Sequence, residues 1–370
     1  TSFLILSYYS VISGWTVNYT LMSLMQFTEG KTPDQIRNVF NILYKSADIC
    51  IFWHIIFVLL TVGVVIGGIR KGIEYWSKIL TPSLLVILVA LFIYSTTLPG
   101  FPEAARFILY PDFSKLTATG VLEALGMSFF TLSVGLGIVL TYGSYLKPDD
   151  NLPSTGLIIG GVSVLVSLVA SLMIFPVIYT FGLEPEMGTG LVFQTLPVLF
   201  NQLPGTLILS TVFFVLFVFT TLTSAISLME VLVANLMEVF SLHRKKSVII
   251  AAIGVFIMGI PTAMAGSGLL FGDWAKMYGT DFFGTLDSLT ANWMMPLGGF
   301  LTAIFVGWVM GKKIVSAEFL LGTKMSYLLP VWLFLLRYIA PIGIFFVILQ
   351  TGNIINIIEI TTWIKGIISW

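Results

Sequence analysis

The sequence predicts an all-α polytopic membrane protein, and three observations predict it. Of its 370 residues, 57% are hydrophobic and 10% are charged, whereas about 25% of the residues of a soluble domain are charged. The mean hydropathy of +1.00 excludes a disordered chain, which needs low hydrophobicity and high net charge. The apolar runs are continuous rather than alternating, which favours membrane helices over the strands of a β-barrel.

Nine apolar segments are long enough to cross a bilayer core, which takes about 20 helical residues. They lie near residues 2–26, 50–69, 76–98, 118–146, 155–182, 205–240, 246–266, 281–311 and 326–350. The tail 353–370 is apolar but contains Glu359 and Lys365, so a short tenth span and an interfacial helix both remain open. Because the first apolar segment begins at Thr1 without a leader, we expect a part of a longer protein.

Lysine and arginine residues gather in alternate loops, which predicts the orientation of the spans. The basic loops contain Arg70, Lys71 and Lys78, then Lys147, then Arg244, Lys245 and Lys246, and finally Lys312, Lys313 and Lys324. We therefore place these loops in the cytoplasm of a cell whose plasma membrane holds the protein. Thr1 then lies on the cytoplasmic side.

The minority residues exclude several functional classes. The charge is balanced, with 18 basic and 18 acidic residues, so nothing suggests nucleic-acid binding. The single cysteine, Cys50, excludes an intrachain disulfide and a thiolate metal cluster, and His54 and His243 are too far apart for a usual histidine metal site. We also expect no enzyme, because no Ser–His or acid pair shares a plausible membrane depth.

The span 118–146 contains a candidate interruption at Phe129–Gly137, with the sequence FFTLSVGLG. Two glycines two residues apart weaken a helix by about 1 kcal/mol each relative to alanine. An unwound stretch at mid-membrane depth would offer carbonyls to a cation and amides to a carboxylate. Close helix packing is the alternative interpretation of these glycines.

Two further spans carry stripes of hydroxyl groups. Thr220, Thr223, Ser224 and Ser227 share one helix face, as do Ser163, Ser167 and Ser171. Hydroxyls in membrane helices often bond only to their own backbone. Together with the glycine-rich interruption, however, these neutral oxygens suit weak sodium coordination better than a tight divalent site.

Ionisable residues within spans are functional candidates by default. Asp287 is either part of a gating ion pair or a helix-end charge that reaches interfacial water, and Glu230 lies in the inner half of its span. For Arg337 we favour pairing with a carboxylate or with helix carbonyls. His54 stands next to Trp53, which favours an anchor at the membrane interface.

Three strings resemble the bacterial neurotransmitter:sodium symporter family. Tyr8–Trp15 (YYSVISGW) resembles the third helix of that family, Phe129–Gly137 its unwound sixth helix, and Leu222–Ser227 (LTSAIS) its eighth. The resemblance runs from residue 1 to about residue 350. It implies the inverted-repeat symporter fold, with helices three to eleven present and the first two absent.

The resemblance also implies the domain organisation and the function. Residues 1–98 would hold helices three to five of the first repeat, 99–311 a loop and the second repeat, and 312–370 the eleventh helix and tail. The implied function is sodium-coupled symport of an amino acid into the cell by alternating access. The alternative is a non-transporting receptor or channel on the same fold. We expect a monomer or a weak homodimer.

The site residues follow from the same resemblance. The implied substrate contacts are Ile5, Tyr9, Phe130, Ser133, Leu136, Ser224 and Leu228. The implied sodium ligands are Thr131, Ser163, Thr220, Thr223 and Ser224. The implied gate residues are Tyr9, Phe130 and Asp287. The apolar Ile5 and Leu136 favour a hydrophobic or aromatic amino acid.

The sequence departs from the family pattern at the first sodium site. Ser163 stands where relatives carry Asn or Asp, and Ser167 stands where some carry Glu, so this helix lacks a fixed counter-charge. Chloride near Thr131 and Ser167, or an acid on an absent helix, would supply it. Met127 stands where a chloride-contacting Gln is common, which weakens the chloride hypothesis. At the second sodium site, Thr220 and Thr221 stand where relatives usually carry a pair of small residues, Ala and Gly.

Overall fold

The computed structural model describes residues 1–147, 150–183, 188–323 and 325–352, and the regular structure in these ranges is helical. Seven helical stretches of the described residues are apolar and long enough to cross a membrane. They are Ala47–Val65, Ile69–Thr96, Leu152–Thr180, Thr206–Phe240, Arg244–Ser267, Phe282–Val309 and Ser326–Thr351. Each overlaps a predicted span, so the all-α membrane class is confirmed.

The other two predicted spans are helical as well. Helix α1 (Ser2–Leu24) carries buried serine and threonine residues along its length, which makes it more polar than the seven. The segment 118–146 is divided into α6 (Ala118–Thr131) and α7 (Ile138–Gly143). The predicted interruption is therefore confirmed.

Short helices between the spans escaped the sequence prediction. They include α2 (Pro33–Lys45), α5 (Phe101–Leu109), α9 (Leu196–Asn201), α12 (Trp274–Tyr278) and α15 (Lys312–Leu320). The start of α2 is a capping box, in which Thr32 and Gln35 exchange side-chain hydrogen bonds of 3.0 and 3.4 Å. The predictions for Lys324 and for the tail 353–370 fall outside the described residues.

The chain forms two compact units, each built from two separate stretches of sequence. The first unit contains Ser2–Pro111 and Val166–Leu286, and the second contains Asp112–Leu165 and Asp287–Trp370. Helix α8 (Leu152–Thr180) contributes residues to both units.

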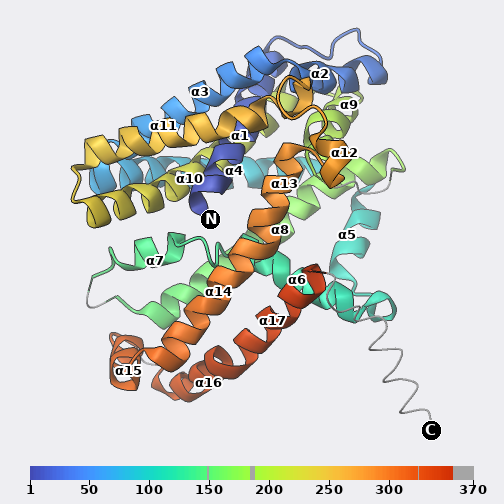
Figure 1. Cartoon of the computed structure of the whole chain (residues 1–370). Helices are drawn as coiled ribbons and strands as arrows, with labels where there is room; N and C mark the ends of the chain where they lie inside the picture. Colours follow the sequence, from blue (N-terminus) through green and yellow to red (C-terminus); the bar gives the residue numbers. More distant parts are fainter. Residues whose placement is uncertain (148–149, 184–187, 324, 353–370) are drawn as a thin grey trace. The chain divides into compact units, whose positions relative to one another are not determined.

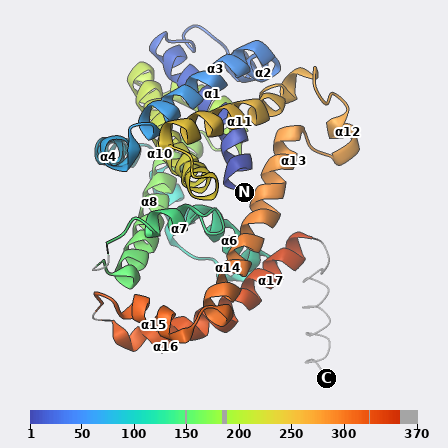
Figure 2. The same cartoon turned by 60° about the vertical axis from the view of Figure 1, so that its left-hand side comes forward.

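In the first unit, α1 packs against three long helices (Figures 1 and 2). They are α3 (Ala47–Val65), α10 (Thr206–Phe240) and α11 (Arg244–Ala263). Gly14 of α1 allows a very close approach to α3, because a Cβ at this position would lie 2.6 Å from the Trp53 carbonyl oxygen. Small residues bring membrane helices together in this way.

Aromatic side chains form the core of the first unit along the second half of α1. Trp15 and Tyr19 are buried, and both contact the ring of Phe193, with ring centroids 5.9 and 5.1 Å apart. The ring of Phe40 on α2 meets Trp15 edge-on at 5.4 Å, one of the arrangements that aromatic pairs prefer. These contacts hold α2 against α1.

In the second unit, α6 packs against α14 (Met295–Ile304) and α17 (Ala340–Thr351). Figure 1 shows α14 and α17 side by side. Glycines lie at these interfaces: a Cβ at Gly343 would be 3.2 Å from the Leu125 side chain, and one at Gly126 would be 3.5 Å from Val347. The helices of this unit are therefore closely packed.

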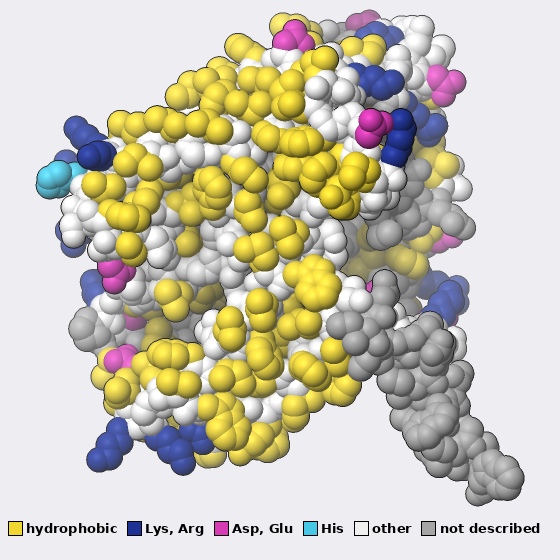
Figure 3. All heavy atoms as spheres, in the orientation of Figure 1, with side chains coloured by type: hydrophobic (Ala, Val, Ile, Leu, Met, Phe, Trp, Pro, Cys, Tyr) yellow, Lys and Arg dark blue, Asp and Glu magenta, His cyan; other side chains and the backbone are white. Residues whose placement is uncertain are grey.

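The outer faces of α3 and α11 in the first unit are covered by hydrophobic side chains (Figure 3). On α11, Ile249, Ile253 and Ile257 recur every four residues and are 50%, 54% and 60% exposed. A soluble protein seldom exposes an apolar stripe of this kind, and a lipid environment explains it.

Candidate functional site

The interruption in the second unit begins with a regular helix stop. After α6, the Ser133 N–H donates to the Phe130 carbonyl (3.1 Å) and the Val134 N–H donates to the Phe129 carbonyl (2.9 Å). This is the hydrogen-bond pattern of a Schellman motif, which needs a left-handed residue at its turn. Ser133 takes that conformation with φ +56°, although glycine is the usual residue there. The candidate substrate contact therefore also turns the backbone.

Gly135 seats the interruption against α14. Its φ is +79°, and a Cβ at this position would lie 2.2 Å from the Met295 carbonyl oxygen. From the other side, a Cβ at Gly298 of α14 would lie 2.9 Å from the Gly135 carbonyl oxygen. Both interpretations of the glycines are thus right, because the helix is broken and the broken segment is closely packed. Gly137, with φ +79°, then caps α7.

The predicted side chains of the interruption differ in their surroundings. The hydroxyl of Thr131 donates to the Met127 carbonyl of its own helix (3.1 Å). Leu136 is buried, Ser133 is half-buried, and the ring of Phe130 is 43% exposed. Phe130 and Thr131 are therefore the exposed members of this group.

A cavity of about 350 Å³ in the second unit brings two of the gate candidates together. Phe130 and Asp287 both line it, with Met127 and Glu123. Gln350 also lines it, and its Oε1 atom is buried with no hydrogen-bond partner among the described residues. The cavity thus combines an aromatic ring with acidic and amide groups.

The first unit brings Tyr9 and Ser224 together. The hydroxyl of Tyr9 on α1 is hydrogen-bonded to the Ser224 side chain on α10. Ile5 and Leu228 are buried on these two helices, and the neighbouring Tyr8 turns instead to Phe283, with ring centroids 5.5 Å apart. The two adjacent tyrosines therefore face different ways.

The hydroxyl stripe of α10 bonds to its own backbone. Thr220 donates to the Leu216 carbonyl (2.9 Å), and Thr223 to the carbonyls of Phe219 (3.1 Å) and Thr220 (2.9 Å). This is how hydroxyls are satisfied in a membrane helix without a ligand, and it leaves their oxygen lone pairs available.

The other predicted ligands lie on α8 and α6. Ser163 is half-buried and Ser167 is exposed, both on α8, and the Ser167 carbonyl accepts from Ser171 (2.9 Å). Thr131 and Ser163 therefore belong to the second unit, whereas Thr220, Thr223 and Ser224 belong to the first.

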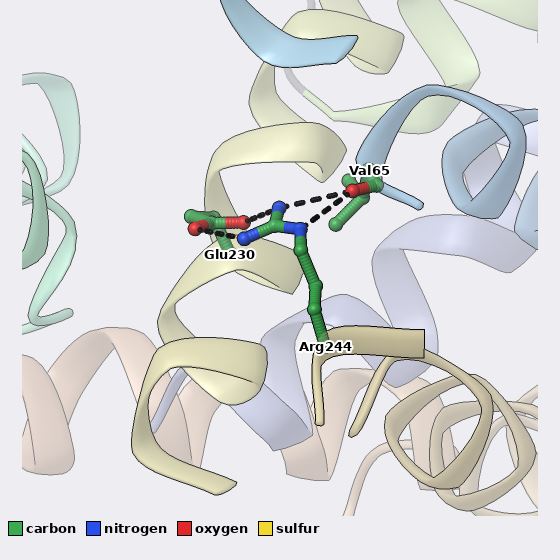
Figure 4. A network of polar contacts seen from close by, with 3 residues as sticks. All are labelled: Val65, Glu230 and Arg244. Atoms are coloured by element: carbon green, nitrogen blue, oxygen red, sulfur yellow. Dashed lines mark hydrogen bonds and ion pairs between the residues drawn. The ribbon is translucent and has the colours of Figure 1, made fainter. Parts of the chain in front are cut away.

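An ion pair in the first unit escaped the sequence prediction. Glu230 on α10 is fully buried, and both of its carboxylate oxygens accept from Arg244, at 2.9 and 2.5 Å (Figure 4). Arg244 also donates twice to the Val65 carbonyl at the end of α3, at 3.1 and 2.9 Å. From the sequence alone, Glu230 was a candidate, but Arg244 was placed in a loop. Arg244, Lys245 and Lys246 begin α11, where positive charge is unfavourable to the helix dipole. This unfavourable placement was a signal that Arg244 has an acidic partner.

Of the predictions for Arg337 and His54, the structure confirms the first and contradicts the second. Arg337 donates to the Gly307 carbonyl (2.6 Å), so its predicted pairing with helix carbonyls is confirmed. The prediction for His54 is wrong. His54 is fully buried between helices and not at an interface, because polar partners on α1 and α11 satisfy both ring nitrogens.

A polar contact outside the spans ties α2 to α13 (Phe282–Ser288). The Tyr44 hydroxyl donates to the carboxylate of Asp281, and Asp281 Oδ1 accepts from the Gly284 N–H at the start of α13 (2.7 Å). Burial, together with this carboxylate, raises the pKa of Tyr44, so its hydroxyl remains a donor at any physiological pH.

The sequence pattern that defines the sodium:neurotransmitter symporter family matches residues 35–364. The chain belongs to this family. It is 34% identical over 355 residues to the uncharacterized sodium-dependent transporter YhdH of Bacillus subtilis, covering 96% of this chain and 78% of that protein. It is 33% identical over 347 residues to an uncharacterized sodium-dependent transporter of Haemophilus influenzae, covering 92% and 75%.

A solved structure supports the same assignment. The chain superposes on the transporter MhsT, crystallised in complex with L-phenylalanine, with a TM-score of 0.84 and 36% identity. The match covers 95% of this chain and 79% of MhsT. The symporter fold is therefore confirmed, and the protein is a multi-pass membrane protein of a sodium-dependent transporter family.

Proposed function

We propose that the protein carries a hydrophobic or aromatic amino acid into the cell, driven by sodium. One observation carries this proposal: the helix is broken at Ser133–Gly137 in a chain that is 36% identical to a transporter crystallised with L-phenylalanine. Broken helices form substrate and ion sites in transporters, because their ends expose backbone groups that a continuous helix would use.

The substrate carboxylate would bind to the Tyr9 hydroxyl, whose present partner is Ser224. Phe130 would cover the substrate as a lid, and Ser133 would contact its ammonium group. Ile5, Leu136 and Leu228 are apolar and buried, which suits a hydrophobic side chain.

Sodium would take oxygen ligands from Thr131 and Ser163 at one site, and from Thr223, Ser224 and the Thr220 carbonyl at the other. Neutral hydroxyls and carbonyls are hard ligands that suit a monovalent cation. Binding of sodium and substrate together would close Phe130, Tyr9 and Asp287 over the site, after which the protein opens inward. Chloride near Thr131 and Ser167 would be a further ion, and exchange of chloride for gluconate in the uptake assay tests it.

Uptake into proteoliposomes tests the proposal. Purified protein is reconstituted, and entry of radiolabelled L-phenylalanine is compared with a sodium gradient and with an equal potassium gradient. We expect L-phenylalanine to enter with the sodium gradient and not with the potassium gradient. Uptake that is equal in potassium, or an ion current without any amino acid, would instead indicate the channel alternative.

A paired substitution assigns the second sodium site. The double variant Thr223→Val with Ser224→Ala is expected to raise the half-saturating sodium concentration about tenfold, which corresponds to about 1.4 kcal/mol. The half-saturating phenylalanine concentration at saturating sodium should change less. Thr61→Val is the control, because its buried hydroxyl also bonds only to its own helix, at Phe57 (3.0 Å). If both half-saturating concentrations rise equally, the assignment is wrong.

A further inference from the structure

A buried histidine that the transport proposal does not use links three helices of the first unit. His54 lies on α3 and is fully buried. Its Nδ1 atom is 3.1 Å from the Ser10 hydroxyl of α1, and its Nε2 atom is 3.2 Å from the Phe256 carbonyl oxygen of α11. One side chain thus fixes α1 and α11 to α3.

The two partners determine which nitrogen carries the hydrogen. A carbonyl oxygen can only accept, so Nε2 must donate to Phe256. The described residues place no carboxylate within ion-pair distance of His54, and a buried imidazolium without a counter-charge is costly. The ring is therefore neutral and Nδ1 is an acceptor. The Ser10 hydroxyl lies 3.1 Å from Nδ1 and also contacts the Leu6 and Ser7 carbonyls of its own helix, at 2.7 and 3.1 Å, so Nδ1 shares the one hydroxyl hydrogen with them.

Packing holds the ring in this orientation. It stacks on Phe256, with ring centroids 5.3 Å apart and an angle of 16° between the planes. It also occupies the space left by Gly259 of α11, where a Cβ would lie 2.4 Å from Nε2. The histidine has no room to turn, so its bond to Ser10 is fixed in direction.

The contact between Ser10 and His54 bears on the rotation of α1 about its own axis. Ser10 and Gly14 face α3, whereas Tyr9 lies about 100° and 140° around the helix from them and meets Ser224 on α10. A rotation of about 10° moves a side chain at a radius of about 6 Å by about 1 Å. A shift of that size is enough to lose a well-placed contact.

We propose that His54 is a positioning residue for substrate binding. Through Ser10 it holds α1 at the rotation that presents the Tyr9 hydroxyl to Ser224 and to the substrate carboxylate. The inference rests on the proposed role of Tyr9 in amino-acid binding.

Substitutions of Ser10 and His54 test this inference in uptake assays with L-phenylalanine. Ser10→Ala and His54→Phe are expected to raise KM at saturating sodium about three- to tenfold, about the effect of one hydrogen bond, with little change in kcat. Ser7→Ala is the matched control. Its hydroxyl lies one turn away on α1 and bonds only to its own helix, at the Leu4 carbonyl (2.6 Å).

A double-mutant cycle distinguishes positioning from a general loss of stability. If His54 acts through the Tyr9 hydroxyl, Ser10→Ala causes no further rise in KM once Tyr9→Phe has removed that hydroxyl. If the rises multiply, or if Ser10→Ala behaves like Ser7→Ala, the inference is overturned. Ser10→Ala carries the test if His54→Phe does not fold.

A spectroscopic measurement judges the inference even if wild-type protein takes up no L-phenylalanine, which would refute the substrate proposal alone. Protein labelled with ¹³C at tyrosine Cζ reports hydroxyl hydrogen bonding, and Tyr9→Phe assigns the Tyr9 signal. We expect this signal to shift in Ser10→Ala and to stay in place in Ser7→Ala. An unshifted Tyr9 signal in Ser10→Ala overturns the inference.

Discussion

Glu230 and Arg244 are unequal partners, because water reaches only one of them. The Glu230 side chain is 0% exposed and the Arg244 side chain 18%. Removal of one member of a buried pair is strongly destabilising, because the other charge is left without compensation. Arg244 also keeps its bonds to the Val65 carbonyl when Glu230 is lost.

We therefore expect Arg244→Gln to destabilise the protein by about 3 kcal/mol and Glu230→Gln by about half as much. The double variant should recover part of the loss, since no unpaired charge remains. Thermal unfolding of the purified variants in detergent measures the order of their stabilities. Equal losses for the two single variants, or additive losses in the double variant, would contradict this account.

At the scale of residues, the sequence could indicate which side chains are unusual but not what they contact. Ser224 and Glu230 were marked because polar groups are rare in an apolar span, and Tyr9 was marked by the family resemblance. The partners of Glu230 and His54 come from other helices, at Arg244 and at Ser10 and Phe256. No local pattern encodes such a pairing, so His54 was misplaced at an interface.

At the scale of elements, the broken helix depends on a position where only glycine fits. Alanine at Gly135 would have to keep φ +79° and place its Cβ 2.2 Å from the Met295 backbone oxygen. The left-handed conformation alone costs about 1–3 kcal/mol for other residues, and the backbone of α14 cannot move aside cheaply.

Gly135→Ala is therefore expected to destabilise the protein by about 3 kcal/mol or more and to abolish uptake. Gly143→Ala is the control, because a Cβ at this position of α7 meets nothing within 4 Å, and alanine is favoured over glycine in a helix by about 1 kcal/mol. Size-exclusion profiles and uptake compare the two variants. A Gly135→Ala variant that folds and transports normally would show that the close packing of Gly135 against α14 is not required.

The spans could be predicted because length and hydropathy are properties of continuous sequence. The same criterion could not find α5 or α9, which are too short for it. For α2, the Thr32 and Gln35 capping box was a local signal that an account based on apolar runs overlooked. The break could be predicted because glycine and hydroxyl residues are costly in the middle of a span, but its Schellman stop at Ser133 depends on backbone angles.

At the scale of the whole molecule, the family could be identified from three short strings, because a transporter concentrates its distinctive residues at its binding site. The distribution of the predicted ligands could not be obtained in this way. Thr131 and Ser163 belong to one compact unit and Thr223 and Ser224 to the other, so sodium binding would depend on the whole chain.

That dependence predicts how ligands stabilise the protein. A ligand that binds only to the folded state adds about 2.7 kcal/mol of stability at 100 times its Kd. If sodium and the amino acid complete one another's sites, each must increase the affinity for the other by the same factor. We therefore expect sodium to raise the melting temperature, potassium to leave it unchanged, and L-phenylalanine to raise it further only in sodium.

The double variant Thr223→Val with Ser224→Ala supplies the matched control for this experiment. It should lose most of the sodium-induced shift, and with it much of the shift caused by L-phenylalanine at the same sodium concentration, because coupling is reciprocal. Thr61→Val should keep both shifts. If L-phenylalanine stabilised the wild-type protein equally in sodium and in potassium, the two ligands would bind independently. The gradient of one could not then drive the movement of the other, and the protein would not be a coupled symporter for this amino acid.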